Sequence, residues 1–429
     1  MAPVAGRARA RPAGGAGLTA TAACGALDAH LAALLAARGE ANREFFSEEA
    51  ERLARVCHLM AERFARSGRL IALGAGPAAA SDARHVAVEF VHPVIVGKSA
   101  LPALAITGGA GALAGGVELL AGERDIVIAF LDGAGHARET ARAVARARER
   151  GCLTIAFAGV GAEWEFEVPG EDEHLRQELV ETLYHLLWEL VHVFFDHRGL
   201  LAGRDARPLH DAGASSFLYP FLAEHERELA PVLEDVRRSV LMKATEIGQL
   251  RAQTLNDNRE PLEGAARALY ASFQGGGTLL ALGNGGSATD AMDVVADFRA
   301  VGGEGRAWPA IDLAADPGII TAIANDVGTD AIFSRQVIAY GRPGDALLAL
   351  STSGNSRNVI DALAHARRRG LLTIAMVGYD GGRIAAGALA DHVVVTRSEH
   401  IPRIQEAQAS AYHALRELVG LLAQTGARA

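Results

Sequence analysis

The chain has 429 residues, of which half are apolar and 22% are charged, so its composition is that of a globular protein long enough for two or three domains. The net charge of −9 and the lack of a long basic block exclude a generic nucleic-acid binder. Three scattered cysteines exclude a disulfide framework, and we expect a cytoplasmic protein. The longest uncharged run, 99–117, is too weakly apolar to predict a transmembrane helix, so no membrane partner is expected.

In chain order, residues 1–26 carry several arginines and no apolar signal-peptide core, and we predict a disordered tail there. A helix is expected over about 46–66. The run RLIALGAG at 69–76 is a short buried-strand pattern that leads into a glycine-rich turn. The segment 197–216, HRGLLAGRDARPLHDAGASS, has the composition of a linker.

An internal repeat runs through the chain. RLIALGAG at 69–76 matches TLLALGNG at 278–285, and ARARERGCLTIAF at 145–157 matches AHARRRGLLTIAM at 364–376. LRQELVETLYHLLWELV at 175–191 matches RIQEAQASAYHALRELV at 403–419. The offset between the copies grows along the chain, which indicates about twenty inserted residues in the second copy. We therefore predict two tandem domains, 27–196 and 217–429.

The second copy alternates between strand-like and helix-like runs. Helices are expected over about 221–255, 287–299, 355–369 and 403–424, and strands over 278–283, 346–350, 371–377 and 391–396. Short apolar strands between helices predict a parallel sheet. The predicted fold class is therefore α/β, with two domains that each contain a parallel sheet flanked by helices on both faces.

Two loops of the second copy follow a buried strand and precede a helix. They read GNGGS at 283–287 and STSGNS at 351–356. Glycines let the backbone approach a ligand, helix starts offer free N–H groups, and hydroxyls add neutral donors, which together suit a phosphate monoester. Ligands of such sheets bind at the carboxyl ends of the strands. The predicted phosphate ligands are Asn284, Gly285, Ser287, Ser351, Thr352, Ser353 and Ser356.

Four motifs in order carry a family resemblance. GNGGS, STSGNS, the segment NDVG at 325–328 with IFSR at 332–335, and RIQE at 403–406 resemble the sugar isomerase (SIS) domain of bacterial phosphoheptose isomerases. The resemblance covers about 240–425, and the first copy resembles the same domain more weakly over 45–195. It implies a phosphorylated sugar as substrate, zinc as cofactor, and Asp326 and Gln405 as further substrate contacts. The implied reaction converts sedoheptulose 7-phosphate to D-glycero-D-manno-heptose 7-phosphate.

The same resemblance implies a metal and catalytic set of four residues in each copy. It comprises a His and a Glu one turn apart on the helix after GNGGS, with a Gln and a His eight apart on the last helix. The first copy offers His85, Glu89, Gln177 and His185, and the second copy offers Asp293, Asp297, Gln405 and His413. Either set is a candidate metal site. The implied acid–base pair is Asp297 or Glu89 with His413 or His185.

At the phosphate loops the second copy keeps the family's residues and the first copy departs from them, the reverse of what is seen for the metal residues. In the first copy GNGGS is replaced by GAGPA at 74–78, and the second loop by DGAGHA at 132–137, which has no hydroxyl. The carboxylate of Asp132 would repel a phosphate at close range. The first copy is thus a degenerate SIS domain that keeps the better metal residues, while the second keeps the phosphate loops.

Helical geometry suggests how the copies combine. Eight residues of helix rise by ~12 Å, whereas ligand bonds to zinc are ~2 Å long. Gln177 and His185 therefore cannot bind the same ion unless Gln177 lies off the helix end; otherwise one of them serves a neighbouring domain. We hypothesise a pseudo-dimer within the chain, in which the second copy supplies the phosphate cradle and first-copy residues complete the site. Chains are further expected to pair as homo-oligomers.

Two functions are consistent with these patterns. The first is an aldose–ketose isomerase of a phosphorylated sugar. The alternative is a non-catalytic, sugar-phosphate-binding regulatory or initiator-associating SIS protein. Asp293 and Asp297, which stand where the family has His and Glu, favour the alternative, whereas Gln405 and His413 favour the enzyme.

Overall fold

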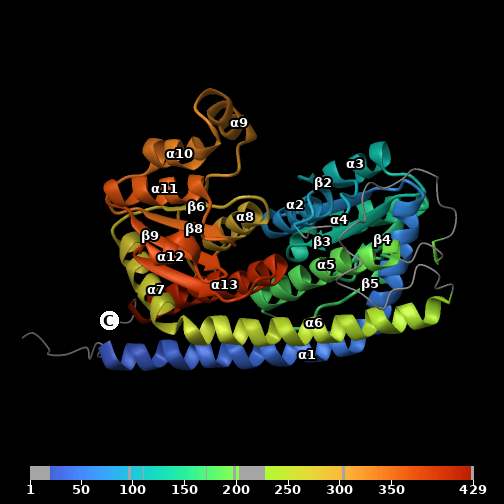
Figure 1. The fold of residues 1–429 in the computed structure, drawn as a ribbon, viewed down its shortest axis with the longest axis horizontal. Helices are drawn as coiled ribbons and strands as arrows, with labels where there is room; N and C mark the ends of the chain where they lie inside the picture. Colours follow the sequence, from blue (N-terminus) through green and yellow to red (C-terminus); the bar gives the residue numbers. More distant parts are fainter. Residues whose placement is uncertain are drawn as a thin grey trace, which may run out of the picture.

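The computed structural model describes residues 20–94, 98–109, 111–170, 172–196, 200–201, 228–301 and 305–426. Two α/β domains lie side by side on a pair of long helices (Figure 1). Each domain contains a five-stranded, fully parallel sheet. The predicted fold class is therefore confirmed. In the part of the chain that the structure describes, no helix is both long enough and apolar enough to cross a membrane.

The first domain has strand order β2-β1-β3-β4-β5. Its strands are β1 (Leu70–Ala75), β2 (Ala103–Thr107), β3 (Ile126–Leu131), β4 (Leu153–Ala156) and β5 (Trp164–Glu165). Its helices are α2 (Pro77–Val91), α3 (Ala112–Leu120), α4 (Ala137–Glu149) and α5 (Glu173–Asp196).

The second domain repeats this order as β7-β6-β8-β9-β10, so the internal repeat is also a repeat of topology. Its strands are β6 (Leu279–Leu282), β7 (Ala310–Asp312), β8 (Ala346–Ser351), β9 (Leu372–Gly378) and β10 (His392–Thr396). Its helices are α7 (Arg259–Gln274), α8 (Gly286–Arg299), α9 (Pro317–Asp326), α10 (Ile332–Tyr340), α11 (Arg357–Arg368), α12 (Gly382–Ala386) and α13 (Ile401–Gly426).

Part of the predicted insertion is the helix α9. In the second domain α9 and a 3₁₀ turn (Thr329–Ala331) lie between β7 and α10, whereas residues 108–111 make the corresponding connection between β2 and α3. Asp330 of this turn pairs with Arg357, the first residue of α11, at 3.3 Å. The insertion therefore reaches the end of the sheet where the predicted phosphate loops lie.

The two long helices exchange partners between the domains. Helix α1 (Ala20–Ala65) and helix α6 (Leu229–Asp257) pack along each other and run in opposite directions (Figure 1). Leu31 and Leu34 of α1 belong to the hydrophobic core of the second domain. Val232 and Val236 of α6 belong to the core of the first. Each domain is thus completed by a helix that the sequence assigns to the other.

These helices correct the predicted boundaries. The helix predicted over 46–66 begins at Ala20, so residues 20–26 are helical rather than part of a disordered tail. Residues 1–19 lie outside the described residues. Of the predicted linker 197–216, only residues 200 and 201 are described, and the second long helix is described from residue 229 onward.

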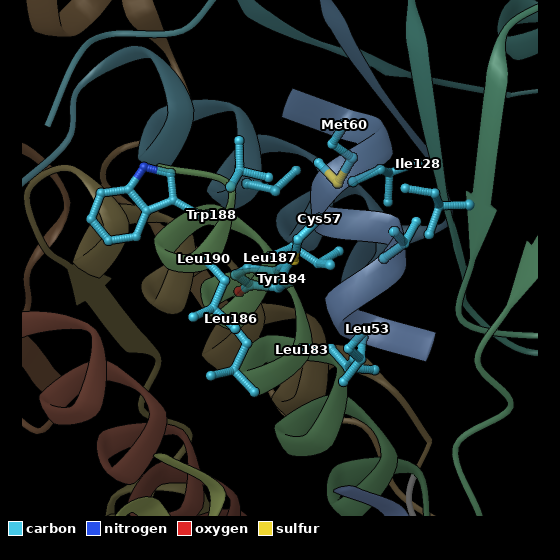
Figure 2. Close-up of a cluster of buried hydrophobic side chains, with 14 of the residues drawn as sticks. Leu53, Cys57, Met60, Ile128, Leu183, Tyr184, Leu186, Leu187, Trp188 and Leu190 are labelled. Carbon is cyan, nitrogen blue, oxygen red and sulfur yellow. The ribbon is translucent and has the colours of Figure 1, made fainter. Parts of the chain in front are cut away.

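The core of the first domain lies between α1, α5 and the sheet (Figure 2). Burial of these apolar side chains at ~25 cal/mol per Å² is the main force that holds the helices on the sheet. The side chains labelled in the figure are Leu53, Cys57 and Met60 of α1, Ile128 of β3, and Leu183, Tyr184, Leu186, Leu187, Trp188 and Leu190 of α5.

Candidate active site

The two predicted phosphate loops form a single cradle, residues 283–287 and 351–356. Strands β6 and β8 are neighbours in the sheet, so the loops that follow them are adjacent. The side-chain amides of Asn284 and Asn358 hydrogen-bond to each other at 2.9 and 3.0 Å and tie the loops together. Gly285 has φ 59°, a conformation that favours glycine.

The cradle has features that suit an anion. Helices α8 and α11 both begin in it, and neither N-cap residue, Gly285 or Ser356, makes a side-chain cap hydrogen bond. The first N–H groups of a helix have no partner within the helix, and the helix dipole favours negative charge there. The Ser351 hydroxyl accepts a hydrogen bond from the Gly354 N–H at 3.2 Å, which shapes the second loop.

The equivalent place in the first repeat is filled by the protein itself. Asp132 Oδ2 accepts a hydrogen bond from the Ala78 N–H at 3.1 Å, so its carboxylate caps α2 where a phosphate would lie in the second repeat. Pro77, at the position of Gly286, has no N–H to donate. At this place the first repeat therefore presents a carboxylate and one N–H donor fewer than the second repeat.

The inner end of the cradle meets the first repeat. Helix α2 packs against α8, and the Ser81 hydroxyl donates to the Thr289 carbonyl at 2.7 Å (Figure 1). A Cβ on Gly286 would lie 2.8 Å from His85 Nε2 and closer still to Gln405 Nε2. The start of α8 is thus in direct contact with a side chain of each repeat.

Four side chains gather at this contact, and we call them the cradle-side cluster: His85, Glu89, His185 and Gln405. Gln405 Nε2 lies 3.2 Å from His85 Nε2, and Glu89 Oε1 lies 3.8 Å from the same nitrogen. The imidazole centroids of His85 and His185 are 5.2 Å apart. All four side chains are buried. The cluster takes three residues from the first repeat and one from the second.

A second group, the opposite cluster, is related to it by the internal repeat and comprises Asp293, Asp297, His413 and Gln177. His413 Nε2 lies 3.4 Å from Asp297 Oδ2, and Gln177 lies beside the Asp293 carboxyl. This cluster lies beside the loops of the first repeat, with Asp297 and Gln177 lining the same cavity as Ala78 and Asp132.

The structure thus separates the predicted site residues into two groups. The glutamines are exchanged relative to the sets taken from a single copy: Gln405 joins His85, and Gln177 joins Asp293. The reason is the rise of the helix: a Gln and a His eight residues apart on one helix are separated by ~12 Å along its axis, so they reach different places. Asp326, a predicted substrate contact, is exposed at the end of α9.

Two glutamates that received no predicted role hold the histidines of the clusters. His185 Nδ1 lies 2.9 Å from Glu406 Oε1, and His413 Nδ1 lies 3.0 Å from Glu178 Oε1, so each His is held by the other repeat. The sequence signal was present, since Gln-Glu recurs at equivalent positions of the two last helices. Its meaning was hidden because the Glu and the His that it holds come from different copies.

The charge on Glu406 determines how His185 is oriented. Burial alone would raise the pKa of Glu406, but the charge of Arg403 and the hydrogen bond with His185 outweigh it and lower the pKa to about 2. Glu406 is therefore ionised near neutral pH and accepts a proton-bearing Nδ1. His185 Nε2, which has no hydrogen-bond partner among the described residues, is left to face the cluster.

Burial also tunes the other members of the cradle-side cluster. It raises the pKa of the Glu89 carboxyl to about 7. It lowers the pKa of His85 well below the ordinary value, and the neighbouring His185 adds to this effect. A carboxyl that titrates near pH 7 is suited to take up and release protons under neutral conditions.

The cradle-side cluster offers donors for a metal ion of the zinc class, and ligand atoms of His85 and His185 lie within 4.8 Å of each other and of the neighbouring Glu181 carboxylate. Two imidazoles, a carboxylate and an amide oxygen are donors that such an ion accepts. Glu89 Oε2, His185 Nε2 and Gln405 Oε1 are buried and have no hydrogen-bond partner in the described parts of the chain. Buried polar atoms without partners are costly, so a bound ion or ligand that reached these atoms would lower that cost.

Known proteins share parts of this sequence and its architecture. A family model described as SIS domain matches residues 244–378. The phosphoheptose isomerase of Chlorobium phaeobacteroides is 45% identical over 175 residues, which are 40% of this chain and 76% of that protein. The chain belongs to the phosphoheptose isomerase family.

Solved structures match the chain across both repeats. The C-terminal domain of glucosamine-fructose-6-phosphate aminotransferase from Francisella tularensis has a TM-score of 0.58 and 9% identity, over 91% of this chain and 95% of that one. A putative phosphosugar isomerase from Silicibacter pomeroyi has a TM-score of 0.54 and 14% identity, over 92% of this chain and 98% of that one. At these identities the matches show the fold, which is shared across both repeats. The family membership and the SIS folds together support a phosphosugar isomerase.

Proposed function

We propose that the chain is an aldose–ketose isomerase that converts sedoheptulose 7-phosphate to D-glycero-D-manno-heptose 7-phosphate at one composite site per chain. One observation carries the proposal: His85 of the first repeat and Gln405 of the second both abut Gly286 of the phosphate cradle. The first repeat lacks the phosphate loops, and the second lacks the His and the Glu of the implied metal set. Pairing of the repeats brings these two parts together on the side of the molecule that holds the cradle, and not on the other side.

In this proposal the cradle binds the phosphate group. The N–H groups at the starts of α8 and α11 and the hydroxyls of Ser287, Ser351, Thr352, Ser353 and Ser356 donate hydrogen bonds to it, with Asn284 and the Gly285 backbone beside them. The sugar carbons then extend toward the cradle-side cluster, with Asp326 and Gln405 as further contacts. Binding at the phosphate fixes the distance from the anchored end to the reacting carbons.

Isomerisation moves one proton between two carbons and one between two oxygens. A base removes a proton from C1 of the ketose, which leaves an enediol, and a proton is delivered to C2 while the hydroxyl at C1 becomes the aldehyde. Glu89, with its pKa raised to about 7, is suited to carry the carbon-bound proton. His185, held by Glu406, is suited to move the proton between the two oxygens.

The chain's own residues would also hold a metal. In the metal-bound form His85, Glu89, His185 and Gln405 are the proposed ligands and zinc is the proposed ion; Glu89 and His185 then coordinate the ion, and their proton transfers belong to the metal-free form. When bound, such an ion supplies positive charge that stabilises the negative oxygens of the enediolate.

The competing function is binding of a sugar phosphate without turnover. Its sequence support was Asp293 and Asp297, and both residues belong to the opposite cluster rather than to the side that faces the cradle. The two functions differ in one observable. With sedoheptulose 7-phosphate in D₂O, an isomerase exchanges the carbon-bound proton for deuterium, which NMR detects, whereas a sensor binds the sugar without exchange.

Separate variants test the shared site. We expect His85→Ala and Ser353→Ala each to abolish or strongly reduce exchange, because one removes a cluster residue of the first repeat and the other a cradle hydroxyl of the second. His192→Ala is the matched control, a buried His on α5 whose hydrogen bonds within the described residues are to the backbone carbonyls of Trp188 and Ser99. Full turnover in His85→Ala would refute the composite site.

Two wider predictions accompany the proposal. We expect the chain to act in the cytoplasm, without nucleic acid or membrane partners, and to form dimers of chains. Size-exclusion chromatography with light scattering measures the second point directly.

A further inference from the structure

Glu181 is a buried carboxylate that belongs to neither cluster and has no role in the proposed reaction. It lies on α5 one helical turn after Gln177 and one turn before His185, so it shares a face of the helix with both. The residue is 3% exposed, and its Oε1 atom has no hydrogen-bond partner among the residues that the structure describes. A buried polar atom in that state calls for an explanation, such as an ion that binds there.

The two histidines of the cradle-side cluster each face a carboxylate of the second repeat with Nδ1. His185 Nδ1 lies 2.9 Å from Glu406 Oε1, and His85 Nδ1 lies 3.4 Å from Asp290 Oδ1. Histidines that bind a metal through one ring nitrogen are commonly oriented by a carboxylate on the other. The Nε2 atoms of both rings are therefore the ones left for an ion.

The carboxylate of Glu181 comes close to both rings. One ligand atom each of His85, Glu181 and His185 lie within 4.8 Å of one another, and all three residues are buried. Bonds from zinc to nitrogen or oxygen are about 2.0–2.2 Å long, so ligand atoms that share a tetrahedral ion lie about 3.3–3.6 Å apart. Inward movements of less than about 1 Å would bring the three atoms onto one ion.

The charges around Glu181 also favour a cation there. Its charged neighbours include the carboxylates of Asp290 and Asp293. The Arg251 guanidinium is a nearby cation, and it donates to the Thr182 hydroxyl at 2.8 Å. Buried carboxylates that crowd together are costly, and a divalent ion bound to one of them would offset that cost.

We propose that Glu181 is a further ligand of the metal ion of the cradle-side cluster, a carboxylate that binds the ion together with His85 and His185. The inference rests on the proposed function, because it concerns the same ion. It also makes the site one-sided, since the position equivalent to Glu181 on α13 is Ala409, which has no ligand atom in its side chain. With Glu89 and Glu181 both bound, two carboxylates balance the charge of a divalent ion.

Zinc affinity tests this assignment without reference to catalysis. The full chain is freed of metal with a chelator and titrated with ZnCl₂ in competition with a chromophoric chelator. We expect Glu181→Gln, which keeps the size of the side chain and removes its charge, to lower zinc affinity by more than about 100-fold, beyond the 10–100-fold typical of groups that only orient a ligand. Glu263→Gln removes another buried carboxyl from the middle of a helix, α7, and is the matched control that should keep wild-type affinity.

Unfolding curves with and without zinc separate a ligand from a merely structural residue. An ion that binds the folded chain stabilises it by an amount that grows with its affinity. We expect metal-free Glu181→Gln to keep wild-type stability, because the change removes a carboxyl from among like charges, and to lose most of the stabilisation that zinc gives. A variant that is destabilised without zinc, yet gains as much from zinc as the wild type, would show that Glu181 is structural and overturn the proposal.

Failure of this proposal is distinguishable from failure of the proposed function. If Glu181→Gln keeps wild-type zinc affinity while His85→Ala loses it, Glu181 is not a ligand and the composite site stands. If the wild-type chain binds no zinc, the assignment of Glu181 is wrong as well, whereas isomerisation is still decided by deuterium exchange from sedoheptulose 7-phosphate.

Discussion

Gly286 is the residue at which the two repeats and the phosphate cradle meet, and its replacement by alanine is a direct test of the composite site. Its backbone does not require glycine, because it begins a helix without a positive φ. The added Cβ would lie 2.8 Å from His85 Nε2, where an ordinary contact begins at 3.4 Å, so His85 must retreat by about 0.6 Å and the amide of Gln405 by more.

Displacements near 1 Å at reacting groups cost about 100-fold in rate. We therefore expect Gly286→Ala to lower kcat/KM for sedoheptulose 7-phosphate by roughly 100-fold, or about 2.7 kcal/mol of transition-state stabilisation. The overpacking should cost about 1–3 kcal/mol in the free energy of unfolding. Zinc content should fall as well, because two proposed ligands move.

A coupled assay of aldose formation measures the rate, and chemical denaturation measures stability. Gly115→Ala on α3 is the control, since a Cβ there meets no atom within 4 Å and the residue has no positive φ. If Gly286→Ala retains wild-type kcat/KM while its fold is intact, the contact between His85, Gln405 and the cradle does not contribute to the reaction, and the composite site is wrong.

Three further changes test the network behind the site. Glu406→Gln should lower kcat and zinc affinity by about 10–100-fold, since it weakens the hold on His185, and it should also destabilise the fold, since it removes a carboxylate from the buried Arg403; kinetics, metal analysis and denaturation measure this. Arg38→Met should lower the free energy of unfolding by about 3 kcal/mol, because it leaves Glu178 buried with one cation fewer; a denaturation curve that matches wild type would contradict this. Glu189 is buried, which opposes ionisation, yet neighbouring cations lower its pKa to about 2. Its ion pairs therefore stabilise the fold above pH 4.5 and lose that effect as the pH falls toward 2; the difference in unfolding free energy between wild type and Glu189→Gln should shrink over that range.

The strands and loops were predictable because their signals are local. Short buried strands, glycine turns and hydroxyl-rich loops follow from residues that are neighbours in the chain, and these elements appear close to the predicted positions. The start of α1 was missed because residues 20–26 carry no apolar periodicity. Further along α1, Leu31 and Leu34 pack into the second domain, a contact that no local pattern reveals.

The amino-acid order by itself determined that the repeats are complementary: one keeps the phosphate loops, and the other keeps His85, Glu89 and His185. It could not decide which glutamine joins which histidine, since Gln405 and His85 are 320 residues apart. Only the tertiary structure decides this, because the side chains meet when α1 and α6 hold the two domains side by side and α2 packs against α8. Interactions between such distant residues depend on packing, and no spacing along the chain encodes them.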